Sequence, residues 1–274
     1  MNAKQLLAAA CGLGGMLASV TLPAQSIARR VAQVKDGTVR ISFAARSDVC
    51  GNGAGNISTG NGTNRTYRSN GSGGSTSTTT SRHNEWEDDC ESGPVRVAID
   101  IADGKPLALR AYVGGRWRAG TDITDLGTVS AKDAVEYLLE DLARADGKVA
   151  GQAIFPATIA DSATVWPRLL TLAKDDSRTK SVRTQAVFWV SQAAGEKATA
   201  GLVEVVGDAA ADQDVRLQAV FALSQRPKDE GIPALLDVAK GSKDPKIRKQ
   251  AIFWLGQSGD PRAVAYFESV LVKK

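Results

Sequence analysis

His83 is the only histidine in this chain of 274 residues, and it limits the acid–base chemistry that the sequence offers. A Ser-His-Asp or Cys-His site would have to use His83, which lies in a segment dominated by small polar residues. The sequence has no His-Glu-x-x-His run, no phosphate-binding glycine loop and no dinucleotide fingerprint. A hydrolase that uses only carboxylates stays an alternative, because paired carboxylates are common and their spacing is not diagnostic. We expect a protein without catalytic residues or cofactors.

Cys50 and Cys90 are the cysteines beyond the N-terminal segment, and they offer redox rather than metal chemistry. In an oxidising compartment an even pair usually forms a disulfide, here across 40 positions. Two cysteines and one histidine are too few ligands for structural zinc. The carboxylates around Cys90 lack the alternating order and glycine turn of a calcium loop, so we predict a solvated acidic patch and no metal site. That patch comprises Glu85, Glu87, Asp88, Asp89 and Glu91.

Residues 1–24 have the pattern of a cleaved secretory signal. Lys4 supplies the positive charge, residues 6–22 are apolar and uncharged, and Leu22-Pro23-Ala24 or Ser26-Ile27-Ala28 provides the cleavage site. A membrane anchor is the rival interpretation, although the run reaches only the lower limit of about 17 residues and is rich in glycine and alanine. A lipoprotein site at Cys11 is less well supported. We predict export to the periplasm or beyond, with no membrane span in the mature chain.

Residues 25–130 have the period-two hydrophobicity of β-strands. Apolar residues alternate with polar ones over 39–43, 95–101 and 107–113, and Asp103-Gly104 is a hairpin-type turn signal. Within this region, Gly, Asn, Ser and Thr fill 26 of the 32 positions of residues 51–82. Such a composition has little to bury. We predict a small, disulfide-closed β-rich domain with a disordered insert over 51–82.

Residues 131–274 change to helical periodicity, with Ser130 as an N-cap, and contain an internal repeat. A Gln-Ala-aliphatic-Phe core recurs at residues 152, 185, 218 and 250, in steps of 33, 33 and 32 residues. A period in this range is typical of stacked helical repeats. We predict helices at 131–145, 148–160, 164–174, 179–194, 197–207, 213–225, 231–240, 245–257 and 261–272. The fold class is therefore a two-part α+β chain, in which a β-rich domain precedes an all-α solenoid.

The repeat resembles the short form of the HEAT-repeat family. The second helix of each later copy opens with an aliphatic residue and an arginine, namely Arg183, Arg216 and Arg248. The first copy departs from this pattern and is predicted to be an atypical end repeat beside the β-rich domain. The resemblance implies a scaffold or partner-binding protein. It also leaves an enzymatic alternative, since bilin lyases carry such repeats.

The helical angles place each phenylalanine of the repeat among glutamines, away from the main apolar stripe. In HEAT-like arrays the second helices line the concave side, so stacking would align these residues into a ridge for a protein partner. The alternative is that each phenylalanine packs on a neighbouring repeat. We name this set the Gln-Phe-Gln ridge: Gln185, Phe188, Gln192, Gln218, Phe221, Gln225, Gln250, Phe253 and Gln257.

The charge distribution offers no support for a nucleic-acid partner. The whole chain carries a formal charge of +4, but residues 131–274 contain 20 Lys and Arg against 19 Asp and Glu. We predict an exported, non-enzymatic scaffold that binds an unidentified protein through the concave face of the solenoid. In a second interpretation, the β-rich domain is the binding module and the solenoid is a rigid spacer.

Overall fold

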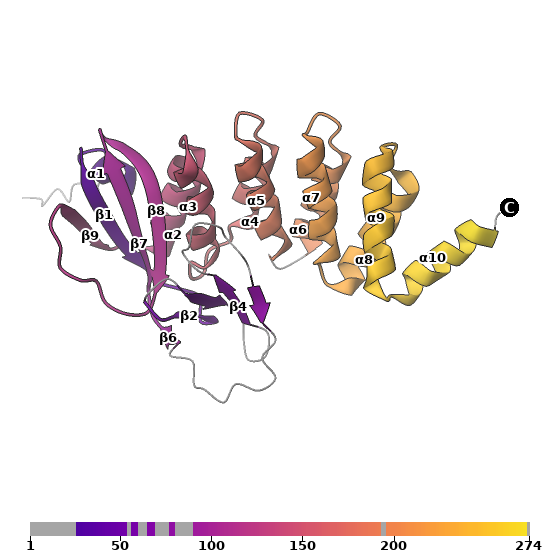
Figure 1. Cartoon of the computed structure of the whole chain (residues 1–274), viewed down its shortest axis with the longest axis horizontal. Helices are drawn as coiled ribbons and strands as arrows, with labels where there is room; N and C mark the ends of the chain where they lie inside the picture. Colours follow the sequence, from indigo (N-terminus) through magenta and orange to yellow (C-terminus); the bar gives the residue numbers. More distant parts are fainter. Residues whose placement is uncertain are drawn as a thin grey trace, which may run out of the picture.

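The computed structural model describes residues 26–53, 56–59, 65–68, 77–79, 90–192 and 196–272. Figure 1 shows a β-sheet at one end, followed by a row of upright helices that extends to the C-terminus. This is the predicted α+β arrangement of a β-rich region followed by helices. The predicted signal segment over 1–24, His83 and most of the acidic patch lie outside the described residues.

The main sheet has four strands in the order β8-β7-β1-β9. The pairs β1–β7 and β7–β8 are antiparallel, whereas β9 runs parallel to β1. Val39, Ile41 and Phe43 are fully buried at alternate positions of β1, which confirms the period-two prediction. The strands are β1 (Gly37–Phe43), β7 (Val95–Ala102), β8 (Lys105–Val113) and β9 (Ile123–Thr128).

The turn between β7 and β8 forms at the predicted Asp103-Gly104 pair. Both residues have positive φ, 50° and 71°. Two-residue hairpin turns favour such residues, because their twist matches that of the strands. The turn is further held by the amide of Asp103, which donates to Asp36 Oδ1 at 3.1 Å.

A second, smaller sheet corrects the expectation for the insert. Five short strands pair in the order β5-β4-β3-β2-β6, and three of them lie within residues 51–82, which were predicted to be disordered. Ile57 is the physical reason at β3, because this isoleucine is only 1% exposed and anchors the strand. The strands are β2 (Val49–Gly51), β3 (Ile57–Thr59), β4 (Arg65–Arg68), β5 (Ser77–Thr79) and β6 (Glu91–Ser92).

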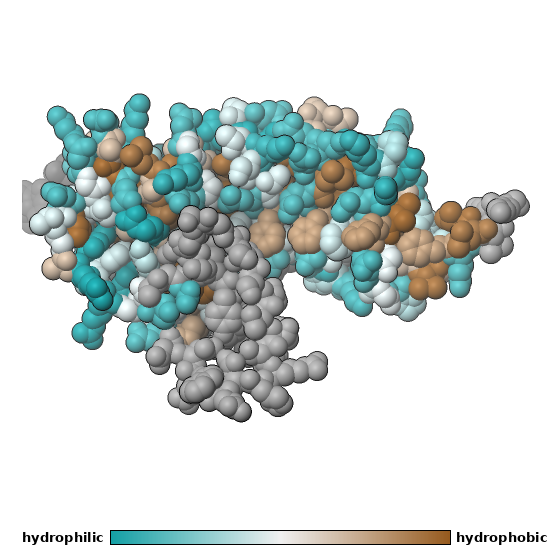
Figure 2. Space-filling view, viewed as in Figure 1, coloured by the Kyte–Doolittle hydropathy of each residue, from teal (hydrophilic) through white to brown (hydrophobic). Residues whose placement is uncertain are grey.

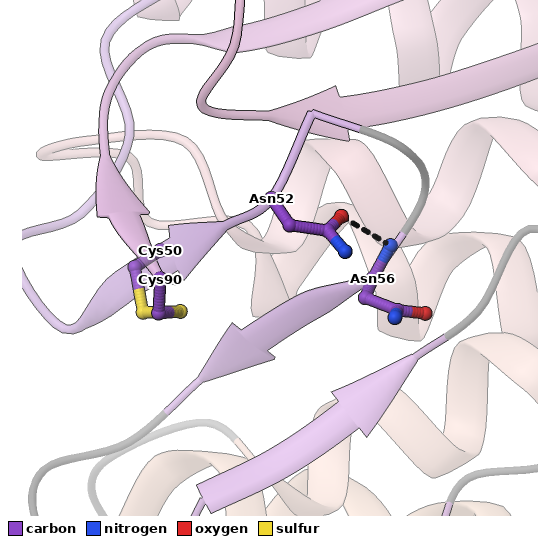
Figure 3. Close-up of a disulfide and its surroundings, with 4 residues drawn as sticks. All are labelled: Cys50, Asn52, Asn56 and Cys90. Atoms are coloured by element: carbon purple, nitrogen blue, oxygen red, sulfur yellow. Dashed lines mark hydrogen bonds between the residues drawn. A yellow bond between two sulfur atoms is a disulfide. The ribbon is translucent and has the colours of Figure 1, made fainter. Parts of the chain in front are cut away.

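The predicted disulfide between Cys50 and Cys90 is confirmed, with the two Cα atoms 5.2 Å apart. Figure 3 shows the bond beside strand β2, together with the loop in which the amide of Asn56 donates to Asn52 Oδ1 at 3.3 Å. Cys50 pairs with Ser92 of β6, so the disulfide reinforces the contact between β2 and the chain that returns to the main sheet.

The helices match the predicted series closely. Ser130 caps α2, as expected, by accepting a hydrogen bond from the amide of Asp133 at 3.0 Å. The helix then passes into a π turn over Tyr137–Asp141 and a 3₁₀ turn over Leu142–Arg144. The remaining helices are α1 (Ile27–Val31), α2 (Ala131–Glu136), α3 (Lys148–Thr158), α4 (Trp166–Lys174), α5 (Lys180–Ser191), α6 (Glu196–Gly207), α7 (Gln213–Ser224), α8 (Lys228–Gly241), α9 (Pro245–Ser258) and α10 (Pro261–Val272).

The repeat is visible in the packing of the first helices, α4, α6 and α8. Leu169, Leu202 and Leu235 follow one another at 33-residue steps, and each is fully buried. The second helices α5, α7 and α9 stand side by side in Figure 1, while α10 extends beyond the row. Equivalent positions in successive repeats can therefore be compared directly.

The sheet and the helices share one hydrophobic core, which runs from β1 to α10. Hydrogen bonds also join the two parts, because the amide of Asp161 donates to Ala44 O at 2.9 Å and that of Arg46 to Ile159 O at 3.0 Å. At the edge strand β8, Gln152 Oε1 accepts from the amide of Leu109 at 2.8 Å. As predicted for an end repeat, the first copy contacts the β-rich region.

Candidate partner-binding face

The three phenylalanines of the Gln-Phe-Gln ridge lie on equivalent positions of α5, α7 and α9. Phe188 and Phe221 are half-buried, and Phe253 is 51% exposed. Figure 2 shows apolar side chains in a line across the face formed by these helices, with polar side chains above and below. The phenylalanines therefore have one accessible side each.

Two tryptophans connect the phenylalanines of neighbouring repeats. Trp189 lies between Phe155 of the preceding copy and Phe188 of its own helix, with ring centroids 5.2 and 5.1 Å away. Trp254 occupies the same place between Phe221 and Phe253, at 5.1 and 5.0 Å. Aromatic pairs at such distances are mutually stabilising. The aromatic side chains therefore pack between neighbouring repeats, as in the alternative prediction, and the phenylalanines of the ridge are also partly accessible to solvent.

Ala222 interrupts the aromatic row, because α7 has this fully buried alanine where α5 and α9 have tryptophan. The aromatic side chains thus form two clusters, one from Phe155 to Phe188 and one from Phe221 to Phe253. Phe155, in the first copy, is only 5% exposed. The accessible part of the row consequently begins at α5.

The glutamines of the ridge frame the phenylalanines on both sides. Gln192, Gln225 and Gln257 are exposed, and the preceding glutamine of each helix is half-buried. The side-chain amide of Gln192 donates to Ser191 Oγ at 3.1 Å, and Gln225 repeats this contact with Ser224 at 3.1 Å. Each Gln Oε1 and second amide hydrogen stay available to a partner.

Two of the three repeat arginines form a ladder between neighbouring copies, whereas Arg248 donates to Ser242 O at 2.7 Å within its own copy. Arg183, whose side chain is 5% exposed, pairs with Asp176 and with Asp212 of the next repeat. Arg216 repeats the contact with Asp244 at 3.0 Å and also donates to Val206 O at 3.0 Å. Because Arg183 and Arg216 are already paired with carboxylates, they favour a structural role over an anion-binding one.

The two aspartates of the ladder differ at their own helices. Asp244 also caps α9, accepting from the amide of Lys246 at 2.9 Å. Burial acts to raise the pKa of Asp244, but the amides of Ile247 and Lys246 and the side chains of Gln213 and Arg216 hold it below its ordinary value. Asp212 holds the N-cap position of α7 without a capping side-chain hydrogen bond, because its carboxylate turns to Arg183.

A buried arginine that the repeat pattern did not single out ties three copies together. Arg226, only 6% exposed, donates to Ser191 O at 3.1 Å and to Thr199 Oγ1 and Glu230 Oε2, both at 2.8 Å. Thr199 and Arg226 together hold the pKa of Glu230 below its ordinary value. The position before Pro227, at the end of α7, is the sequence signal that could have marked this residue.

Side-by-side helix pairs with a shared core define an α-solenoid. A family model described as HEAT repeats matches residues 201–274, which include α7 to α10, in agreement with the resemblance of the repeat core. A search of curated proteins finds no match to the chain. None of the helices in the described ranges is long and apolar enough to cross a membrane. Within the same ranges no group of three or more potential metal ligands occurs.

Proposed function

We propose that this chain is an exported, non-enzymatic scaffold that binds a protein partner through the Gln-Phe-Gln ridge. The observation that carries the proposal is the accessible phenylalanine in a frame of glutamines, repeated on α5, α7 and α9. Aromatic side chains surrounded by polar groups are typical of binding hot spots. The match to HEAT repeats supports the same class of function, because such solenoids present extended binding surfaces.

Export is supported by two features of the chain. The Cys50–Cys90 disulfide is compatible with an oxidising compartment. Ser26 also caps α1, and Ile27 is 5% exposed in the core, so cleavage after Ala24 would leave that helix intact. Cleavage after Ala28 would remove both residues, which favours 1–24 as the signal segment.

The experiment is affinity capture from an extract of the cell envelope, with the mature chain and a Phe253→Ser variant as baits. Phe253 is chosen because its exposure allows the change with little effect on the fold. A protein that the mature chain retains and the variant loses would support the ridge. Retention of the same protein by both baits would contradict it.

The matched control is Leu107→Ser, because Leu107 is a large apolar residue that is 52% exposed on the edge strand β8. This control also tests the second candidate, in which the β-rich region is the binding module. If the partner is lost with Leu107→Ser and kept with Phe253→Ser, the sheet is the binding surface and the solenoid is a spacer. Both variants are first compared with the mature chain by circular dichroism.

A further inference from the structure

A cavity of about 480 Å³ opens between the first helices α6 and α8, near the loops that lead to α7 and α9. Its apolar wall includes Val203, Val206 and Val238, and Asp237 and Lys243 are exposed among its lining residues. The volume lies within the range of ligand sites. The cavity is formed by the first helices and is separate from the Gln-Phe-Gln ridge.

The origin of the cavity is visible when it is compared with the preceding repeat. There, Lys174 at the end of α4 donates to Glu204 of α6 at 2.6 Å and so bridges two copies. One period of 33 residues later, the equivalents of Lys174 and Glu204 are Gly207 and Asp237. The carboxylate is conserved between the two steps, whereas the lysine side chain is missing.

The next step of the array restores a lysine. Lys240, again 33 residues after Gly207, places its Nζ 5.8 Å from the ring centroid of Tyr266 on α10. Among these three equivalent positions, only Gly207 sends no side chain towards the following repeat. The cavity therefore opens beside the position at which the steps before and after it carry a lysine.

The wall beside Gly207 is correspondingly uncovered. Val203 is 37% exposed, whereas its equivalent in the preceding repeat, Leu170, is only 9% exposed and packs against Gly201. Within the described residues, neither Asp237 nor Lys243 takes part in an ion pair. Arg216, at the side of the cavity, is neutralised by Asp244 at 3.0 Å.

We propose that this cavity binds a lysine side chain of a partner protein, in the position that Lys174 holds in the preceding repeat. The aliphatic stem lies on the apolar wall at Val203, which is 37% exposed, and the ammonium group pairs with the Asp237 carboxylate. Long cationic side chains bury their stems on apolar surface in this way and keep the charged end polar. The proposal does not depend on the ridge.

The test is an NMR titration of the isotope-labelled mature chain with N-acetyl-lysine methylamide. The matched neutral probe is N-acetyl-norleucine methylamide, which has the same four-carbon stem without the charge. We expect saturable shifts of the Gly207, Val238 and Ser242 amides with the lysine probe. The norleucine probe is expected to bind more weakly by up to about fivefold, the effect of losing one exposed charge pair.

Two variants make the test specific. Asp237→Asn removes the carboxylate from an exposed position and is expected to weaken binding of the lysine probe by up to about fivefold. Gly207→Lys fills the cavity from within and is expected to abolish the shifts; a Cβ at Gly207 meets no atom within 4 Å, so the helix tolerates the change. The absence of saturable shifts in the mature chain would overturn the proposal. Equal binding of the two probes, or unchanged lysine binding by Asp237→Asn, would overturn it as well.

Discussion

Replacing Arg226 by methionine should destabilise the solenoid more than any surface change, because this arginine holds three copies together. Its side chain is 3% exposed and donates to Ser191 O, Thr199 Oγ1 and Glu230 Oε2. Methionine keeps much of the apolar stem but removes the hydrogen bonds to Ser191 O and Thr199 Oγ1 and takes the cationic partner away from Glu230. Removing one partner of a buried ion pair costs about 3–5 kcal/mol, and we expect about 3 kcal/mol here, since Glu230 is partly exposed.

For a chain of this size, about 3 kcal/mol corresponds to a fall in Tm of about 6–12 °C. Thermal unfolding followed by circular dichroism measures the total change, and amide hydrogen exchange locates it. We expect faster exchange in α5 to α8, which surround Arg226, and little change in the sheet. Because repeat arrays can unfold in stages, the variant and the mature chain are compared by their local exchange rates.

The matched control is Arg168→Met, which removes an ion pair with Glu140 at 3.2 Å in which both side chains are more than one-third exposed. Such pairs contribute less than about 1 kcal/mol. Equal losses of stability in Arg226→Met and Arg168→Met would refute the assignment of Arg226 as a clamp. In a double-variant cycle with Glu230→Gln, the two losses should also be less than additive.

Three further outcomes follow from the packing and the charges. Phe155→Ala should lower the free energy of unfolding by about 3 kcal/mol, because this ring is buried against Trp189, whereas Phe253→Ala should lower it by less than about 1 kcal/mol. Urea unfolding measures both values, and equal losses would contradict the assignment of Phe253 as an accessible side chain. Removing the disulfide by Cys90→Ser should lower the free energy of unfolding by about 4 kcal/mol in the loop-entropy model. Urea unfolding measures this loss, with the reduced mature chain as the control. An unchanged free energy of unfolding would contradict the prediction. Hydrogen bonds from Arg262 lower the pKa of Asp260 from 3.8 to about 2, so its stabilisation of the start of α10 is present above pH 4 and is lost as the pH falls through 2. Amide exchange of α10 across this range should show the loss in the mature chain and not in Asp260→Asn.

The helices of the solenoid were predictable because their signals are local and repeated. The helices α5, α7 and α9 each carry an aliphatic-arginine pair and a phenylalanine, and the period of 32 or 33 residues allows each copy to be checked against the others. The largest shift of a helix start is at α8, which begins at Lys228 where the pattern predicts 231. The reason is that Pro227 takes the N-cap position and two acidic residues follow it in the first turn.

The β-rich region was less predictable because its pairing is not local. Strand β9 is largely exposed and has little apolar alternation, so only its parallel register with β1 identifies it. In the small sheet, Ile57 is a buried anchor within a stretch of small polar residues. The composition of this segment therefore did not predict strand pairing.

The candidate sites also differ in whether a local sequence signal marks them. The ridge was predicted from helical angles, because Phe188 and its equivalents share a position within one helix. Arg226 and the cavity at Gly207 depend on contacts between repeats, which an angle within one helix does not reveal. For Gly207 a signal did exist, since the series Lys174, Gly207 and Lys240 appears once the first helices are aligned at 33 residues.

The continuous core from the sheet to the helices has a consequence for the evolution and engineering of this chain. Gln152 and the backbone around Ile159 form hydrogen bonds with the β-rich region, so one end of the helical array is fixed to that region. Each later copy contacts mainly its immediate neighbours. Duplication or deletion of one 33-residue period between α5 and α9 would therefore change the length of the array and preserve both junctions. The number of repeats, and with it the reach of the molecule, is a variable that selection can adjust independently of the sheet.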